Sequence, residues 1–250
     1  MTLLRPIAFA LLFTAPALAL AETPLRNNTW AGTAEFGLAV ASGNSESQTL
    51  NGKLALDRDG EVWLYGINAS ALRAKAEDDL SANRYELGGR LGYLFSERLY
   101  GFGALRYEND DFASYRWQTV LSAGFGYRFV DSDRTRLVGE LGPGVRYWQP
   151  VDELSGAPAA LIARDAESDA VLRGTAEFTH QLGANTALIN NLLVESGSGS
   201  AFLQNELGLA VKMSERFALK VGYEVRHTTE VPSGVEKTDR LLTTNLVVGF

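Results

Sequence analysis

Several residue types are scarce or absent in this chain. It contains no cysteine, two methionines, two histidines and seven prolines among its 250 residues. The absence of cysteine excludes disulfide bonds and thiol chemistry. The formal net charge of -7 argues against general nucleic-acid binding, because such binding neutralises phosphates with Lys and Arg.

A long hydrophobic run is also missing from most of the chain. After residue 21, no stretch approaches the ~20 unbroken apolar residues that a transmembrane helix needs. Residues 1–21 are different, because one early cation (Arg5) precedes an apolar run that ends in Ala19-Leu20-Ala21. This is the pattern of a secretory signal peptide, with a buried N-terminal helix as the alternative. We expect export by the general secretory route and a single domain over 22–250.

The dominant pattern in the mature chain is alternation with period two. In the clearest run, one parity carries apolar and aromatic side chains and the other carries Gly and charges. The apolar parity of that run holds Tyr85, Leu87, Leu91, Tyr93 and Phe95. Such runs number about twelve, each of roughly ten residues, which is the length that crosses a membrane when a strand is tilted. No helical period is found outside residues 1–21.

The connections between these runs alternate in length. The short ones are at 58–60, 96–98, 130–134, 182–186 and 214–216. The longer ones are at 75–83, 109–114, 149–168 and 229–238, with 42–46 and 196–200 of intermediate length. Short periplasmic turns and longer outer loops are typical of outer-membrane barrels. An even number of strands also places both ends of the barrel domain on one side.

The last stretch, Asp239 to Phe250, predicts how the barrel closes. Its apolar parity holds Leu242, Leu246, Val248 and Phe250. These side chains must face lipid if Trp30, Phe36 and Leu38 do so on the first strand. Leu241 and Val247 then face the lumen, as the least polar part of its wall. A terminal Phe resembles the end of bacterial outer-membrane barrels, which implies that the assembly machinery recognises Phe250.

These patterns together predict an all-β fold: an antiparallel up-and-down transmembrane β-barrel of about twelve strands, after a signal peptide. The competing architecture is a soluble secreted sandwich or lipocalin-like barrel that binds a ligand. Its apolar side chains would point inward. The aromatic residues at the strand ends and the Gly-rich, charged opposite faces favour the membrane barrel.

Short motifs in order along the chain support a family. They are Trp30-Ala31-Gly32, Gly37, Ser42-Gly43-Asn44-Ser45, Tyr107-Glu108-Asn109-Asp110, Phe112, Arg116, Gly124-Phe125-Gly126-Tyr127 and Glu140-Leu141-Gly142-Pro143-Gly144. The set resembles the YdiY-like family of salt-induced outer-membrane proteins over the whole mature chain. The resemblance implies a Gram-negative outer-membrane barrel related to envelope or osmotic stress. It implies no catalytic residues.

If the apolar parity faces lipid, the opposite parity lines the lumen. Its charged candidates are Glu35, Lys53, Arg84, Glu86, Arg90, Arg116, Arg128, Arg136, Glu140, Arg146, Arg173, Glu177, Glu206, Lys212, Lys220, Glu224 and Arg226. Unpaired charges in a narrow interior are costly, so most must be paired or hydrated. Two interpretations follow. One is a salt-bridged, closed lumen that holds the barrel together, and the other is a narrow pore whose cationic excess favours anions.

Catalytic and metal motifs are missing from the sequence. No nucleophile elbow, P-loop or zinc-protease helix occurs, and His180 has no metal ligand at suitable spacing. The enzyme alternative is a phospholipase-like hydrolase with His227 near the outer rim, where Thr229 stands in the serine position of a His-x-Ser pair. We expect no enzyme activity, cofactor, metal or nucleic-acid partner. The expected partners are outer-membrane lipid, the barrel-assembly machinery and, for a pore, small ions.

Overall fold

The structure is a computed structural model of the chain. It describes residues 29–41, 47–77, 79–151, 153–155, 160–162, 165–231 and 236–250. The expected signal peptide, residues 1–21, lies outside the described residues. Within these ranges, no helix reaches the length and apolar character needed to cross a membrane.

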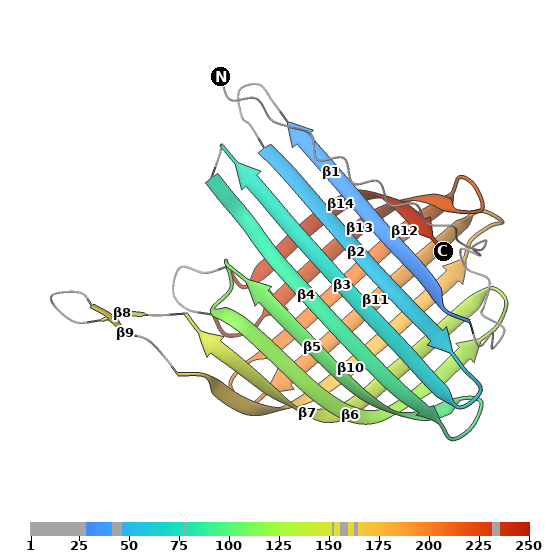
Figure 1. The fold of residues 1–250 in the computed structure, drawn as a ribbon, viewed down its shortest axis with the longest axis horizontal. Coiled ribbons are helices and arrows are strands. Elements are labelled where there is room, and N and C mark those ends of the chain that lie inside the picture. The colour runs from blue at the N-terminus through green and yellow to red at the C-terminus, as the bar shows by residue number, and fades with distance from the viewer. Residues whose placement is uncertain are drawn as a thin grey trace.

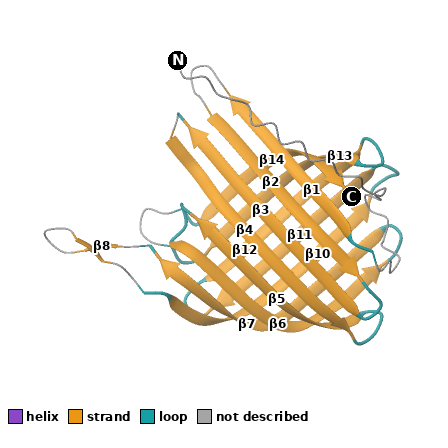
Figure 2. Ribbon diagram, viewed as in Figure 1, coloured by secondary structure: helices purple, strands orange, loops and turns teal. Residues whose placement is uncertain are grey.

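Twelve antiparallel strands close into one barrel, which confirms the predicted fold class (Figures 1 and 2). The barrel strands are β1 (Ala31–Ala41), β2 (Ser47–Asp59), β3 (Trp63–Ala76), β4 (Asp79–Leu94), β5 (Leu99–Asp110), β6 (Tyr115–Asp131), β7 (Thr135–Pro150), β10 (Glu167–Gln181), β11 (Thr186–Gly197), β12 (Ala201–Lys212), β13 (Phe217–Thr228) and β14 (Thr238–Gly249). Successive strands are neighbours, with β7 next to β10 and β14 next to β1. The short strands β8 (Glu153–Ser155) and β9 (Ala160–Ile162) pair as a separate hairpin.

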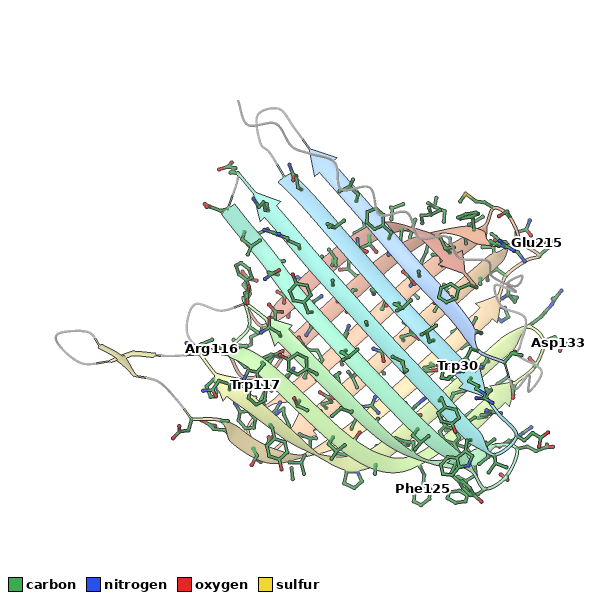
Figure 3. All side chains as sticks on the ribbon, viewed as in Figure 1. Trp30, Arg116, Trp117, Phe125, Asp133 and Glu215 are labelled. Atoms are coloured by element: carbon green, nitrogen blue, oxygen red, sulfur yellow. The ribbon has the colours of Figure 1, made fainter. Side chains whose placement is uncertain are left out.

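The two ends of the barrel differ in their connections. At one end, here called the turn end, strands are joined by the short segments 60–62, 95–98, 132–134, 182–185 and 213–216. The opposite, loop end carries the β8–β9 hairpin and the connection between β13 and β14. Figure 3 shows Asp133 and Glu215 at the turn end and Arg116 and Trp117 at the loop end.

Burial follows the predicted alternation, with the apolar side outward as the membrane barrel requires. On β13, Phe217, Leu219, Val221 and Tyr223 are exposed, whereas the residues between them are buried. Exposed large apolar side chains occur on β1–β7, β10 and β12–β14. An apolar patch of this extent is stable in lipid and not in water. Most large apolar side chains therefore point outward, unlike those of a soluble barrel. The inward-pointing ones include one buried cluster, formed by Leu64, Leu94, Tyr100, Phe102, Ala104 and Val138.

Aromatic contacts gather at the turn end of this exterior. Trp63 lies 5.1 Å from Tyr93 between ring centroids, and Tyr127 lies 5.2 Å from Phe129. Amphipathic rings prefer the membrane–water interface, where the apolar body contacts acyl chains and the polar atom contacts headgroups. The predicted aromatic belt is thus present at this end.

The prediction of a loop over the polar stretch 75–83 is wrong. β3 runs to Ala76 and β4 begins at Asp79, so only two residues connect them. Glu77 makes the tight turn with φ of 51°, in the left-handed region. A register shift between Ala74 and Lys75 marks the same hairpin. The polar composition reflects a hairpin with both faces in water and not a loss of strand structure.

The weak alternation over residues 187–195 has a local explanation. Asn190 and Asn205 lie at lipid-facing positions of adjacent strands β11 and β12. Their amides exchange two hydrogen bonds of 3.2 Å. Asn190 also donates to the carbonyl of Glu206 at 3.2 Å. Because each amide satisfies the other, β11 tolerates polar side chains on its outer face.

Candidate functional site

The lumen is the part of the molecule where polar chemistry concentrates. Inward positions of all twelve barrel strands converge there, and glycines leave room for long side chains. A Cβ on Gly126 would collide with the ring of Tyr100, and one on Gly208 would lie 2.9 Å from Cε of Lys220. Glycine on the inner face therefore gives space to the neighbouring aromatic or cationic side chain.

Four charged residues form what we call the loop-end cluster: Arg106, Glu108, Glu195 and Arg226. Each lies two to four residues from the loop end of its strand. Arg106 donates to both oxygens of Glu195 and to Glu108, and Arg226 donates to Glu108. The side chains of Glu108 and Glu195 are fully buried.

The contact between Arg226 and Glu108 crosses the lumen. In the closed order of strands, β13 and β5 are six places apart in a ring of twelve, so they are opposite walls. Arg106 and Glu195 join β5 to β11, four places apart. The loop-end cluster therefore spans the interior and does not merely line it.

Aromatic and amide groups complete this cluster. Tyr115 donates its hydroxyl to Glu108 at 2.9 Å, and Gln118 donates to the same carboxylate at 3.0 Å. The Phe202 ring has the guanidinium of Arg226 at 4.9 Å and that of Arg106 at 5.3 Å from its centroid. Glu108 thus has four hydrogen-bond donors, which compensate for the loss of hydration.

A second set of ion pairs lies nearer the middle of the barrel. Lys53 contacts Glu206 at 2.8 Å and Glu224 at 3.3 Å. Lys220 contacts Glu206 at 2.9 Å and Glu35 at 2.7 Å. The charges therefore alternate in sign around β1, β2, β12 and β13. Each of these lysines and carboxylates has a partner of opposite charge.

The opposite side of the lumen is organised around Glu140. Arg90 lies 2.8 Å and Arg173 lies 3.5 Å from its carboxylate oxygens. Tyr100 donates its hydroxyl to the same group at 2.9 Å. Arg84 on β4 reaches across to Glu224 on β13 at 2.9 Å.

The loop-end cluster separates two spaces. A central cavity of about 450 Å³ lies on one side and a vestibule of about 120 Å³ lies at the loop end, and Arg226 lines both. The central cavity has seven Lys or Arg and seven Asp or Glu in its lining. The cationic excess predicted from the sequence is therefore absent from this cavity. Asp57 adds a negative charge that was not predicted, and five of the predicted cations lie elsewhere: Arg116, Arg128, Arg136, Arg146 and Lys212.

Twelve of the predicted lumen residues line the central cavity. They are Glu35, Lys53, Arg84, Glu86, Arg90, Glu140, Arg173, Glu177, Glu206, Lys220, Glu224 and Arg226. Three others form ion pairs elsewhere in the barrel, with Arg128 and Arg136 contacting Asp59 at 3.1 and 3.6 Å and Arg146 contacting Asp169 at 2.9 Å. Lys212 lines a smaller space of about 200 Å³ at the turn end.

Arg116 does not join these groups. A register irregularity between Tyr115 and Trp117 leaves Arg116 exposed at the loop end (Figure 3). The extra residue reverses the parity, so Tyr115 takes the inward position and reaches Glu108. A bulge of this kind has no signal in the alternation itself.

Three of the most deeply placed charges were not among the predicted lumen residues. Arg106, Glu108 and Glu195 are all buried, and all three take part in the contacts that span the interior. The alternation on β5 is ambiguous, because Tyr100 and Phe102 share the parity of Arg106 and Glu108, while Leu99, Leu105 and Tyr107 hold the other. The aromatic residues on the inward parity hide the signal that would have placed both charges inside.

The two histidines make local contacts. His227 Nδ1 lies 2.8 Å from Oγ1 of Thr238, and His180 Nδ1 lies 2.8 Å from Oγ1 of Thr135. The hydroxyl of Thr229 accepts from the backbone N–H of Ala201 at 2.9 Å. In the part of the chain that the structure describes, no group of three His, Cys, Asp or Glu is arranged to hold a metal ion.

A protein family and a bacterial protein match most of this chain in sequence. The model of the family described as "Protein of unknown function, DUF481" matches residues 34–250. The uncharacterized protein YdiY of Escherichia coli (strain K12) is 29% identical over 216 residues, covering 86% of this chain and 81% of that protein. This confirms the resemblance to YdiY-like proteins that the motifs indicated.

Several solved barrels are similar in shape. The translocator domain of autotransporter NalP from Neisseria meningitidis has a TM-score of 0.49 and 14% identity, over 88% of this chain and 86% of that chain. The COG4313 outer membrane channel from Pseudomonas putida F1 has a TM-score of 0.48 and 12% identity, over 93% and 99% of the two chains. The NanC porin has a TM-score of 0.45 and 10% identity, over 88% and 97%.

Proposed function

The chain belongs to the DUF481 family of proteins of unknown function, and from that premise we propose that it is an outer-membrane β-barrel of structural type whose lumen is held closed at the loop end. In this proposal the loop-end cluster is a barrier formed by the wall's own side chains. The protein acts as an integral element of the envelope and not as a general diffusion pore or an enzyme.

The observation that carries the proposal is the contact of Arg226 with Glu108 across the lumen. Removing one partner from such a buried pair leaves an uncompensated charge, which costs about 3–5 kcal/mol. A solute would have to displace both side chains and the Phe202 ring stacked against Arg226. Neutral solutes can therefore pass only when these side chains move out of the lumen.

The apolar outer face and the C-terminal strand support the proposed location and partners. The apolar outer face supports residence in the outer membrane after export by the general secretory route. The C-terminal strand supports recognition by the barrel-assembly machinery, because Phe250 ends a strand that must pair with β1. The absence of enzyme activity is part of the proposal: the hydroxyl next to His227 is that of Thr238, and the hydroxyl of Thr229 accepts from the backbone of Ala201 instead of contacting His227.

A liposome-swelling assay tests the closed lumen. Proteoliposomes that contain the refolded protein are diluted into isosmotic solutions of a pentose, with a general porin and protein-free liposomes as references. The expected swelling rate equals that of protein-free liposomes. A rate that approaches the porin reference and falls with solute size would overturn the proposal.

A narrow ion pore is the second candidate. Glu177 and Asp57 line the central cavity, yet their side chains are about half exposed. This part of the lumen is therefore hydrated, and a shift of the loop-end cluster would connect it to the vestibule. Because the lining charges balance, such a pore would select weakly between cations and anions, contrary to the anion preference predicted from the sequence.

A role in envelope or osmotic stress is a further part of the proposal that rests on family resemblance. It is tested by measuring the amount of this protein in outer-membrane fractions after a shift in external salt. An increase supports the role, and an unchanged amount contradicts it.

A further inference from the structure

The seam that closes the barrel is paired over only part of its length. Backbone hydrogen bonds of 2.7 and 2.9 Å join Gly32 and Phe250, and the ladder continues to the pair Phe36 and Leu246. On its other side β1 stays paired with β2 as far as Ala41. Similarly, β14 stays paired with β13 back to Thr238. Within the described residues, the loop-end half of the seam thus has two strand edges and no ladder between them.

Buried amides mark the point where the ladder ends. A Cβ on Gly37 would collide with the side chains of Asn245 and Asn51. Both asparagines are buried, and in both the side-chain carbonyl oxygen has no hydrogen-bond partner. Asn245 donates its amide to Glu35 at 3.0 Å, which holds it inward. The end of the ladder is therefore a defined feature of the fold.

The open part of the seam lies at membrane depth. Leu38 on β1 and Leu242 on β14 flank it and are 62% and 71% exposed, so they belong to the lipid-facing surface. Unpaired backbone groups facing hydrocarbon cost several kcal/mol each. Such an opening is stable only where the edges reach water or another polar group from the lumen side.

An apolar path runs through the wall at this place. Leu241 and Leu242 are adjacent, so one side chain points into the lumen and the other into lipid. Leu241 and Thr243 line the central cavity. Leu241 is one of several apolar residues that line this cavity, together with Leu72 on β3 and Leu193 on β11. The inner wall beside the open edge is therefore apolar at Leu241.

We propose that the loop-end half of the β1–β14 seam is a lateral opening that admits the acyl chain of a membrane lipid toward the central cavity. The occupant is lipid because the outer rim of the opening, Leu38 and Leu242, is part of the surface that lipid covers. The chain contacts Leu241 inside the wall, and water in the cavity hydrates the open edges. This inference does not depend on whether the loop-end cluster closes the lumen to solutes.

The cysteine-free sequence allows a direct test by site-specific labelling. Single variants Leu242→Cys, Thr243→Cys and Thr175→Cys are labelled with bimane and refolded into phosphatidylcholine vesicles that contain doxyl-labelled phosphatidylcholine. Leu242 is the lipid-facing reference. Thr175 lines the same cavity from β10 and is the matched control for Thr243. Heat-modifiable gel mobility verifies that each variant has folded.

We expect the quenching of bimane fluorescence at position 243 to reach at least half of that at position 242. The fluorescence at position 175 should stay near its value in vesicles without the doxyl label. Equal, weak quenching at 243 and 175 would overturn the proposal, because lipid chains then do not pass the seam.

Disulfide formation tests the open seam independently. If the ladder continued, Leu38 would face Thr244. The double variant Leu38→Cys/Thr244→Cys is compared with Ala34→Cys/Val248→Cys, whose positions are paired in the ladder. We expect rapid intramolecular oxidation only in the second variant, since disulfides need Cα atoms within about 7 Å. Equal oxidation would show a closed seam, and cross-linked dimers through position 38 would show a second copy in place of lipid. Either result overturns the proposal.

Discussion

Arg226 on β13 donates a hydrogen bond to Glu108 on β5, and these two strands lie on opposite walls of the barrel. Because the residues are 118 positions apart in the chain, the contact exists only when the barrel has closed. It ties the two walls together and, with Arg106 and Glu195, fills the loop end of the lumen.

Loss of the Glu108 charge should destabilise the barrel strongly. In Glu108→Gln, the guanidinium of Arg226 stays buried without its anionic partner, and we expect a loss of about 3–5 kcal/mol in the free energy of unfolding. Urea titration of the protein in lipid vesicles measures it. Glu215→Gln in an exposed turn is the control and should change little.

The double variant Glu108→Gln/Arg226→Met should be less destabilised than the sum of the two single variants. A coupling energy of about 0.5–3 kcal/mol is expected for residues in one network. Additive losses would show that the contact contributes nothing beyond the burial of each side chain.

Gly142 should not tolerate a side chain. A Cβ there would collide with the backbone carbonyl of Ala123 and lie 2.7 Å from Cα of Gly124, so β6 and β7 would have to separate. We expect Gly142→Ala to cost about 1–3 kcal/mol, measured as a lower midpoint of heat-induced mobility change. Gly103→Ala, where a Cβ meets nothing within 4 Å, is the matched control and should fold like the native chain.

The paired amides on the lipid face make a fourth prediction. Asn190→Leu leaves the amide of Asn205 without its partner in an apolar environment, and we expect a loss of about 0.6–2 kcal/mol. Asn190→Leu/Asn205→Leu removes both polar groups, so the double variant should be at least as stable as the native protein. Urea titration in vesicles compares the three, and a double variant less stable than Asn190→Leu would contradict the pairing.

Deletion of Phe250 should impair assembly more than it impairs the folded barrel. The deletion removes two backbone hydrogen bonds to Gly32 but leaves the ladder from Thr33 to Phe36. We expect less of the truncated chain in outer-membrane fractions of cells, and near-native mobility after refolding in vitro. Equal insertion of both chains in cells would contradict the role of Phe250 in recognition.

Alternation along each strand predicted the barrel and its inside and outside, because period two is a local property of the chain. Leu242 and Val247 show this most clearly, since one is exposed and the other buried as their parity requires. The hairpin at Glu77 was mistaken for a loop, because strands that extend into water lose the apolar parity that marks them.

The sequence did not predict which charged residues pair across the lumen. Which cation meets Glu108 depends on strand tilt and on the stagger around the closed sheet, and neither is encoded in a single run. The bulge at Arg116 and the early end of the ladder at Phe36 are likewise set by pairing geometry. Sequence therefore predicted most of the charged lining residues but not the network that they form.

Single-channel recording in planar bilayers tests the closed lumen most directly. The native protein is compared with Glu108→Ala/Arg226→Ala, a double variant that removes the pair across the lumen and leaves the net charge unchanged. We predict no discrete conductance steps for the native protein and clear steps for the variant. Steps of the same size in both proteins would contradict the account, because the contact of Arg226 with Glu108 would then not close the barrel.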